Sequence, residues 1–235
     1  MNLSVKIAQK SILLHFLSTF AGMKSLTDTE YIHLLIAEGE HQKQDFKFEI
    51  SDARKIAKTL SAFANTDGGR LLIGVKDNGK IAGVRSDEEQ YMIEAAAQIY
   101  CLPEVNYSMR TFHAEGRNVL VVQIEESLRK PVYAKDETGK PLAYLRIKDE
   151  NILATSVHLR VWQQSCNPRG ELMAYTEREK MLLDLLEKNE CLSLNQYCKL
   201  AHLSRRAAEH LLAKLIRFEI VEPVFEGHKF HFRLK

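Results

Sequence analysis

Apolar residues recur at helical spacing in seven segments of the chain, and residues that cap helices stand before several of them. A Thr or Ser followed three residues later by Glu lets each side chain accept a free backbone N–H from the other residue. Such pairs begin at Thr27, Ser86 and Thr176, while Ser51 and Ser204 are single N-cap candidates. The pattern predicts helices at about 27–38, 52–65, 87–100, 154–165, 177–188, 194–201 and 205–218.

Alternating and short apolar runs between these helices predict β-strands. From Gln44 to Ile50 apolar and charged residues alternate, so Phe46 is expected on one face of a strand, and Asp45 and Lys47 on the other. Asp77-Asn78-Gly79 lies between two apolar runs and indicates a tight hairpin. Further strands are expected at 71–75, 81–84, 105–112, 118–124, 131–135 and 142–147. This order of elements favours an α+β fold with a mixed sheet.

Composition and charge exclude few classes of protein. The 235 residues are 45% hydrophobic and 27% charged, as in ordinary globular proteins, and the formal net charge is only +2. A surface for nucleic acid must therefore come from local clustering of basic residues. Cys101, Cys166, Cys191 and Cys198 include no C-x-x-C pair, which argues against a zinc finger and a disulfide framework. Reduced thiols fit a cytoplasmic protein.

The pattern also suggests where the domains begin and end. Residues 1–26 carry three Lys and no acid, and their apolar stretch at 12–20 is too short to span a membrane. We expect an N-terminal extension there, either disordered or upstream of the true start, with a weak secretory signal as the alternative. Cys166-Asn-Pro-Arg-Gly170 ends a helical pattern and predicts a linker at 166–172. The expected domains are therefore 27–165 and 173–235.

The run from Ala62 to Gly79 combines a helix end, paired glycines, a short strand and a hairpin turn. Together with Glu40-x-x-x-x-Asp45-Phe-Lys47 upstream, it resembles the Schlafen/AlbA-like family, formerly called divergent AAA proteins. The resemblance covers about residues 27–160 and implies a mixed-sheet α+β domain. No G-x-x-x-x-G-K-[ST] phosphate loop occurs in the chain, which argues against an ATP site of that type.

In the nuclease members of this family three carboxylates hold a metal for RNA cleavage. The resemblance places these ligands at Glu40, Asp45 and Asp77, with Lys47 beside the phosphate. Oxygen ligands suit Mg²⁺ or Mn²⁺. This sequence departs from the pattern because Asp45 replaces a Glu. The simpler interpretation is that Asp77 is a turn residue and that Asp45 and Lys47 lie on the solvated face of an edge strand.

After Thr176 the pattern changes to three apolar helical stripes followed by two alternating runs around Gly227. Three helices and a terminal β-hairpin resemble a winged helix-turn-helix over about 175–235. The third helix would be the recognition helix, and the hairpin would be the wing. The residues predicted to contact nucleic acid are Arg205, Arg206, His210, Lys214 and Arg217 on the helix and His228 and Lys229 on the wing.

We therefore expect a nucleic-acid-binding protein, in the first place a DNA-binding transcriptional regulator. The winged helix would contact DNA, and the AlbA-like domain would supply a second binding surface or a dimer interface. Binding would need no cofactor. A Mg²⁺- or Mn²⁺-dependent endoribonuclease acting on structured RNA is the first alternative. A protein-interaction module or a nucleotide-binding protein is the second, because residues 171–235 hold 11 Lys and Arg against 10 Asp and Glu.

Overall fold

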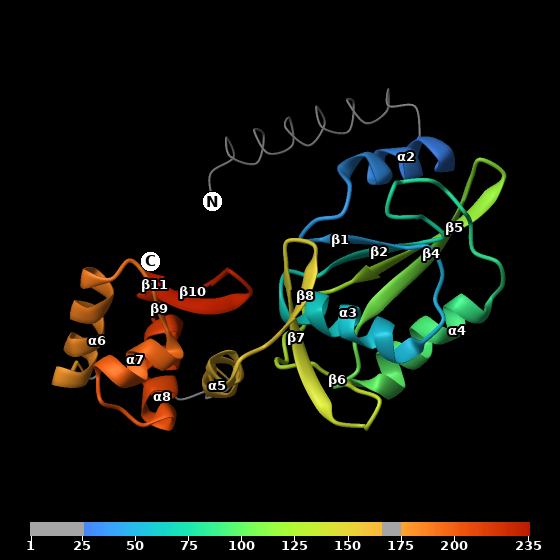
Figure 1. Cartoon of the computed structure of the whole chain (residues 1–235). Helices are drawn as coiled ribbons and strands as arrows, with labels where there is room; N and C mark the ends of the chain where they lie inside the picture. The colour runs from blue at the N-terminus through green and yellow to red at the C-terminus, as the bar shows by residue number, and fades with distance from the viewer. Residues whose placement is uncertain (1–25, 166–174) are drawn as a thin grey trace, which may run out of the picture.

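The computed structural model describes residues 26–165 and 175–235 (Figure 1). The predictions for residues 1–25 and for the linker at 166–172 lie outside the described residues. The helices are α2 (Asp28–Glu38), α3 (Ala53–Asn65), α4 (Glu88–Ala95), the π-helical turn η1 (Ala96–Tyr100), α5 (Ser156–Ser165), α6 (Glu177–Lys188), α7 (Leu194–Leu200) and α8 (Arg205–Arg217). The strands are β1 (Gln44–Lys47), β2 (Gly69–Ile73), β3 (Cys101–Leu102), β4 (Tyr107–Ala114), β5 (Arg117–Ile124), β6 (Tyr133–Lys135), β7 (Pro141–Ile147), β8 (Glu150–Leu153), β9 (Leu192–Ser193), β10 (Val221–Glu226) and β11 (Lys229–Leu234).

The first part of the chain is built in layers around one mixed sheet. Its strand order is β1-β2-β5-β4, with β1 parallel to β2 and the other pairs antiparallel. Helix α2 covers one face, where Ile32 and Leu35 pack with Phe46 of β1. Helix α3 covers the other face, and a second, antiparallel sheet β3-β6-β7-β8 packs against α3. The predicted α+β fold with a mixed sheet is confirmed.

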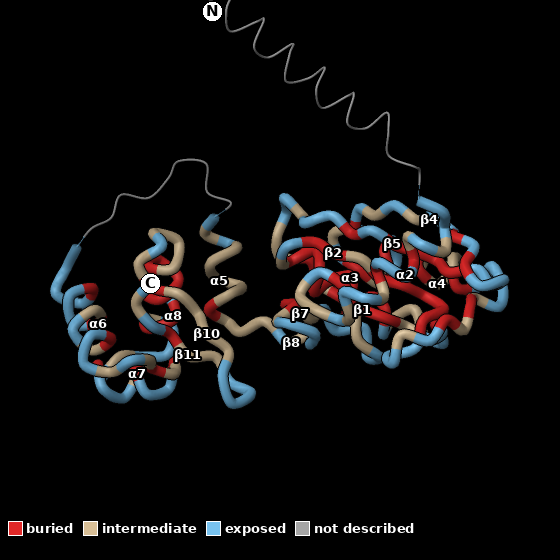
Figure 2. The backbone as a smooth tube through the Cα atoms, turned by 90° about the horizontal axis from the view of Figure 1, so that it is seen from above, coloured by how far each residue is buried: buried red, intermediate tan, exposed pale blue. Residues whose placement is uncertain are grey.

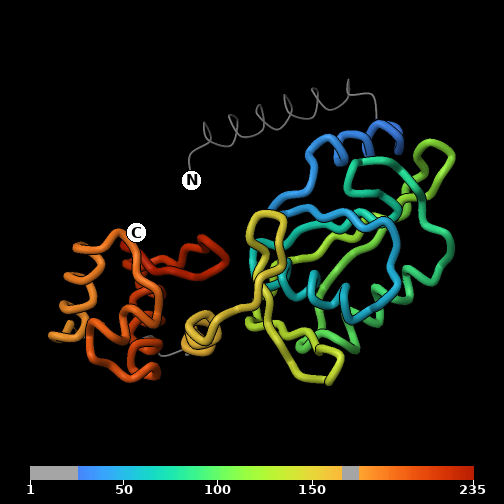
Figure 3. Tube along the Cα trace, in the orientation of Figure 1, coloured from blue at the N-terminus to red at the C-terminus, as the bar shows by residue number. Residues whose placement is uncertain are grey.

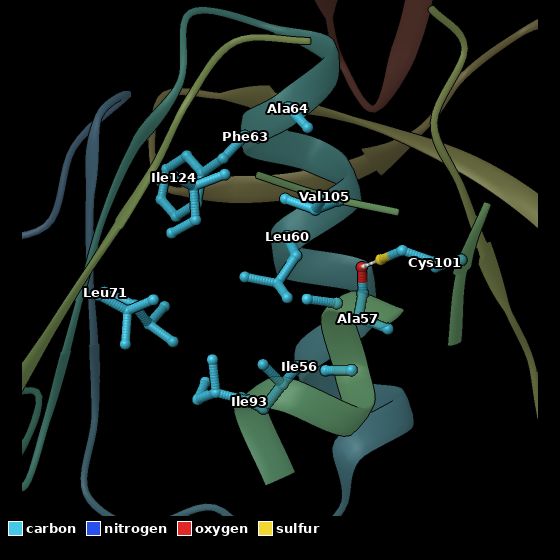
Figure 4. Packing of buried hydrophobic residues seen from close by; sticks show 14 of the residues in the cluster. Ile56, Ala57, Leu60, Phe63, Ala64, Leu71, Ile93, Cys101, Val105 and Ile124 are labelled. Carbon is cyan, nitrogen blue, oxygen red and sulfur yellow. Dashed lines mark hydrogen bonds between the residues drawn. The ribbon is translucent and has the colours of Figure 1, made fainter. Parts of the chain in front are cut away.

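Helix α3 lies at the centre of this layered core. Its apolar residues Leu60 and Phe63 have no exposed surface and point toward Leu71 and Ile124 of the first sheet (Figure 4). On its other side, Asn65 donates to the carbonyl oxygens of Val132 (2.8 Å) and Tyr144 (3.0 Å). A buried amide that is fully paired in this way ties the second sheet to the helix.

The paired glycines after α3 are required by close backbone packing. Gly68 has φ +67°, and a Cβ atom there would lie 2.8 Å from the carbonyl oxygen of Ile124. A Cβ at Gly69 would lie 2.5 Å from the Phe63 ring. The motif that carried the family resemblance is therefore explained by the turn and by strand packing.

The C-terminal part contains three helices, α6 to α8, and a small sheet of order β10-β11-β9. Leu182, Leu212 and Phe232 are among its buried residues. Helix α5, which the sequence analysis assigned to the first domain, packs along α8 and buries Val157 in this C-terminal core. Figure 2 shows the buried residues of the two cores, and Figure 3 traces the chain from β8 through α5.

Local signals predicted most element starts. The capping boxes at Thr27 and Thr176 are both formed, and Ser204 caps α8. Ser86 is bonded by Glu89, but the N-cap position of α4 is Asp87, and Asp52 replaces Ser51 as the cap of α3. The capping box of Ser193 with Gln196, ahead of α7, was not predicted. Among the described residues no helix is both long and apolar enough to cross a membrane.

The predicted strand boundaries were less accurate. Strand β1 ends at Lys47 instead of continuing to Ile50, and the predicted strand at 81–84 is reduced to a single bridge between Val75 and Ile81. The short strands β3, β8 and β9 were missed. These elements are defined by pairing with distant partners, which leaves only a weak trace in the local pattern.

Candidate functional site

Two of the three predicted carboxylates lie together beside β1. The Glu40 side chain accepts a hydrogen bond from the backbone N–H of Phe46 (Oε1 to N, 2.9 Å) and neighbours the Asp45 carboxyl. Partial burial raises the pKa of the Glu40 carboxyl, and the adjacent Asp45 carboxyl raises this pKa further. The Phe46 hydrogen bond and the charge of Lys47 act in the opposite direction.

The Asp45 carboxylate forms ion pairs with two cations. Its Oδ1 lies 3.1 Å from Nη2 of Arg146 on β7, and its Oδ2 lies 2.7 Å from Nζ of Lys47. The predicted shared face of Asp45 and Lys47 is therefore confirmed. The alternative of a solvated face is wrong for Asp45, which is only 4% exposed, because β7 brings Arg146 over that side of the edge strand.

Arg146 is the centre of this cluster and is itself 1% exposed. Besides Asp45, it donates to the carbonyl oxygen of Gln44 (3.2 Å) and to Oδ1 of Asn151 (3.1 Å). Its guanidinium also lies over the Phe63 ring, 5.1 Å from the ring centroid. A buried guanidinium surrounded by these partners joins β1 to the second sheet.

Asp77 does not join Glu40 and Asp45. It is an exposed residue of the turn between Lys76 and Lys80, where the N–H of Gly79 donates to the carbonyl oxygen of Lys76 (2.7 Å). In the described part of the chain no group of three or more His, Cys, Asp or Glu side chains could hold a metal ion. The predicted ligand set of Glu40, Asp45 and Asp77 is therefore not assembled, and Asp77 has the geometry of the turn residue that the simpler interpretation gave it.

At the start of α8, Arg205 and Arg206 are both exposed, as predicted. Arg205 donates to Oε1 of Glu209 (3.1 Å) and to Oδ1 of Asn195 (3.1 Å), so its guanidinium is held in one orientation. The Arg206 side chain has no hydrogen bond or ion pair among the described residues. Ser204 caps the helix directly before both arginines.

Farther along α8 the predicted basic face is partly covered. Lys214 is buried and its Nζ lies 2.7 Å from Oε1 of Glu179, so its prediction as an exposed contact residue is wrong. The cause is α6, whose first turn packs beside this part of α8. Arg217 is partly buried. His210 is exposed, but its Nδ1 lies 3.0 Å from Nε2 of Gln164 on α5.

The tip of the β10–β11 hairpin is exposed and carries Glu226, His228 and Lys229. Glu226 pairs with Lys229 across a two-residue turn, and Gly227 and His228 both have positive φ, at +56° and +60°. These are the backbone angles of a tight hairpin that matches the twist of its strands. His228 and Lys229 are therefore accessible, as predicted.

Residues 40–155 match the family model described as Schlafen, AlbA_2. This segment, slightly less than half of the chain, is similar to a Schlafen AlbA_2 domain. The matched segment begins at Glu40, includes the Gly68-Gly69 turn and the Asp45–Arg146 pair, and ends one residue before α5. Helix α5 and the C-terminal unit lie outside this AlbA_2 match.

Solved structures give only distant likenesses. The DIP2311 protein of Corynebacterium diphtheriae aligns over 80% of this chain at 16% identity, with a TM-score of 0.46, and the chain covers 34% of that protein. The N-terminal domain of a putative ATP-dependent DNA helicase RecG-related protein from Nitrosomonas europaea aligns over 64% of this chain and 97% of its own length. Its identity is 23% and its TM-score is 0.39. A search of curated proteins gives no significant match.

Sequence reasoning missed two features of these sites. Arg146 was not among the predicted site residues, although a charged residue inside an apolar strand already signals a buried partner. The second feature is α5, whose Arg160 lies 3.3 Å from Glu209 of α8. The helical spacing of its apolar residues predicted a helix, but this spacing does not indicate which core the helix joins.

Proposed function

We propose that this protein binds nucleic acid and that its C-terminal unit is a winged helix whose α8 contacts DNA. The observation that carries the proposal is the position of Arg205 and Arg206. Both are exposed at the N-terminus of a capped helix, in a unit of three helices with a hairpin whose tip exposes Lys229. Arginine can bind guanine edges or phosphates at such a position.

The contact is confined to the first turn of α8. Glu209 is buried against Ser156 and Arg160 of α5, and His210 contacts Gln164 of the same helix. Lys214 is held by Glu179. Arg206, with Arg205 beside it, is therefore the residue to which DNA has the freest access.

In this proposal the protein is a DNA-binding regulator, and the AlbA_2 domain provides a second nucleic-acid surface or a dimer interface. The Schlafen AlbA_2 match supports a nucleic-acid-related role for the first domain. Two weak sites in one chain, or in a dimer, raise the apparent affinity without new contacts. Cleavage of RNA stays a prediction, and no observation in the described residues favours it.

The decisive variant is Arg206→Ala, measured by fluorescence anisotropy on duplex DNA selected from a random library. We expect the affinity to fall by about 1–3 kcal/mol for a base contact, or the salt slope to fall by about one for a phosphate contact. The matched control is Arg178→Ala, which removes another exposed arginine, from the first turn of α6. Equal affinity and equal salt slope in both variants would exclude α8 as the recognition helix.

A further inference from the structure

A cleft of about 620 Å³ lies between the β10–β11 hairpin and strand β8 of the AlbA_2 domain. One wall is formed by Leu153 and its neighbours on β8, and the opposite wall by Phe225 and Phe230 of the hairpin. The start of α8 and the hairpin turn close its rim. Figure 1 shows the hairpin extending from the C-terminal unit toward β7 and β8. This size is typical of sites that hold one small organic ligand.

The rim of the cleft is cationic. Arg205 and Lys229 line it together with the His228 ring, and no Asp or Glu is among the lining residues in the described part of the chain. The nearest acid on α8, Glu209, is buried and already paired with Arg160 and Arg205. Glu209 balances only one of the two arginine charges, so one positive charge remains there to attract an anion, beside Lys229, whose cross-strand neighbour is Glu226. Asn195 holds the Arg205 guanidinium in place (3.1 Å), which lowers the entropy cost of binding.

The wall opposite β8 is aromatic. Phe225 and Phe230 are cross-strand partners whose ring centroids are 5.0 Å apart, and both are only partly buried. Phe230 also packs against His158 of α5, with 4.5 Å between the ring centroids. Burial lowers the pKa of His158 to about 4, so this ring is neutral near pH 7 and acts as an apolar support. Rings that are held from behind but exposed in front can stack with a planar group.

We propose that this cleft binds a single nucleotide unit, with its base on Phe225 and Phe230 and its phosphate at Arg205 and Lys229. A cationic rim beside an aromatic wall is the combination by which proteins hold unpaired nucleotides. The ligand has two sources: a free mononucleotide, or an unpaired nucleotide in single-stranded nucleic acid. The site differs from the duplex contact of Arg206, but the second source rests on the proposed nucleic-acid function.

The full-length protein carries its own reporter, because Trp162 is the single tryptophan of the sequence. Its ring centroid lies 6.3 Å from that of His158, which touches Phe230. Titration with AMP, adenosine and a single-stranded oligothymidylate should therefore change tryptophan emission. AMP should bind at least tenfold more tightly than adenosine, since adenosine lacks the phosphate.

Two variants test the two halves of the site. Lys229→Gln removes a rim charge from an exposed residue, and Phe225→Leu keeps apolar volume but removes the stacking face. Each should weaken binding of AMP or the oligonucleotide about tenfold. The control Lys180→Gln removes an exposed lysine of α6, outside the cleft, and should change nothing. Equal binding by Lys229→Gln, Phe225→Leu and Lys180→Gln would overturn the proposal, as would an unchanged emission with every ligand.

The outcomes also separate the two sources and the two proposals. Saturation by AMP at lower concentration than by the oligonucleotide identifies a free nucleotide as the ligand, whereas saturation by the oligonucleotide alone identifies single-stranded nucleic acid. Arg206→Ala should weaken duplex binding by the amount given above and leave the emission titration intact. Binding of AMP without binding of duplex DNA would support the cleft as a nucleotide site and contradict the proposed DNA contact. Binding of duplex DNA without binding of AMP or the oligonucleotide would contradict the cleft proposal alone.

Discussion

The pair formed by Asp45 and Arg146 explains why a residue at a predicted metal position has another role in this chain. Arg146 cannot be buried unless its charge is matched, and Asp45 supplies that charge from the edge strand β1. Lys47 binds the other carboxylate oxygen. Both oxygens of Asp45 are thus engaged by cations, which competes directly with a divalent metal. The shorter side chain at this position agrees with a structural link between the two sheets.

A second buried pair, Glu179 with Lys214, predicts how stability depends on pH. Although burial opposes ionisation, hydrogen bonds from Lys214 and Thr176 lower the pKa of Glu179 from 4.5 to about 2. The folded-state pKa lies below the unfolded value. Glu179 therefore contributes stability that is fully present above about pH 4.5 and is lost as the pH falls toward 2.

The Glu179→Gln variant should thus be less stable than the wild type at pH 7, and the two should converge near pH 2. Chemical denaturation at a series of pH values measures this difference. Glu177→Gln is the control, because Glu177 is an exposed acid in the same first turn of α6. A constant difference between Glu179→Gln and wild type from pH 7 to pH 2 would show that the ion pair with Lys214 does not control stability.

The conformation of the turn that contains Asp77 bears directly on the predicted metal site. Its turn is closed by backbone hydrogen bonds and a positive φ at Gly79, and Asp77 is exposed. Asn suits this turn position as well as Asp. We therefore expect Mn²⁺ to shift the melting temperatures of wild type and Asp77→Asn equally, or to shift neither.

Differential scanning fluorimetry with Mn²⁺ and with the metal chelated measures both melting temperatures. The Glu40→Gln variant should be measured in the same way, because Glu40 lies beside Asp45 whereas Asp77 does not. A stabilisation by Mn²⁺ that disappears in Asp77→Asn would contradict the structure and restore the nuclease alternative. Equal shifts in wild type and Asp77→Asn would limit Asp77 to the turn.

The same elements show how far the sequence can predict a structure. Caps such as Thr27 and Thr176 were predicted because the residues that bond are three positions apart. The burial of Asp45 was not, because its partner is 101 residues away and nothing in the local alternation identifies it. Strand β1 likewise ends earlier than predicted, just before Phe48. The Phe48 ring contacts two cations from distant segments, with Nζ of Lys76 4.9 Å and Cζ of Arg85 5.7 Å from the ring centroid. Contacts between distant segments set strand ends and charge partners.

The predicted domain organisation differs from the structure mainly in the unit to which α5 belongs. The family match ends at Thr155, and α5 begins at the next residue. Val157 is fully buried with residues of α6, α7 and α8, and Ser156 and Arg160 both bond Glu209 of α8. The helical pattern alone could not assign α5 to either core, since both neighbours offer apolar surface. The structure makes it a fourth helix of the C-terminal unit.

This assignment predicts the behaviour of two fragments. A fragment of residues 154–235 should melt cooperatively, whereas a fragment of residues 173–235 should be much less stable. The shorter fragment exposes the surface of α8 that α5 covers, and it leaves the buried Glu209 without Arg160 and Ser156. Circular dichroism melts give both stabilities.

In the longer fragment, Val157→Ala should cost about 2 kcal/mol, because it creates a cavity at a fully buried position. Gln163→Ala, an exposed position of the same helix, is the control and should be neutral. Equal melting temperatures for the two fragments, or no effect of Val157→Ala, would return α5 to the first domain and restore the boundary at 166–172.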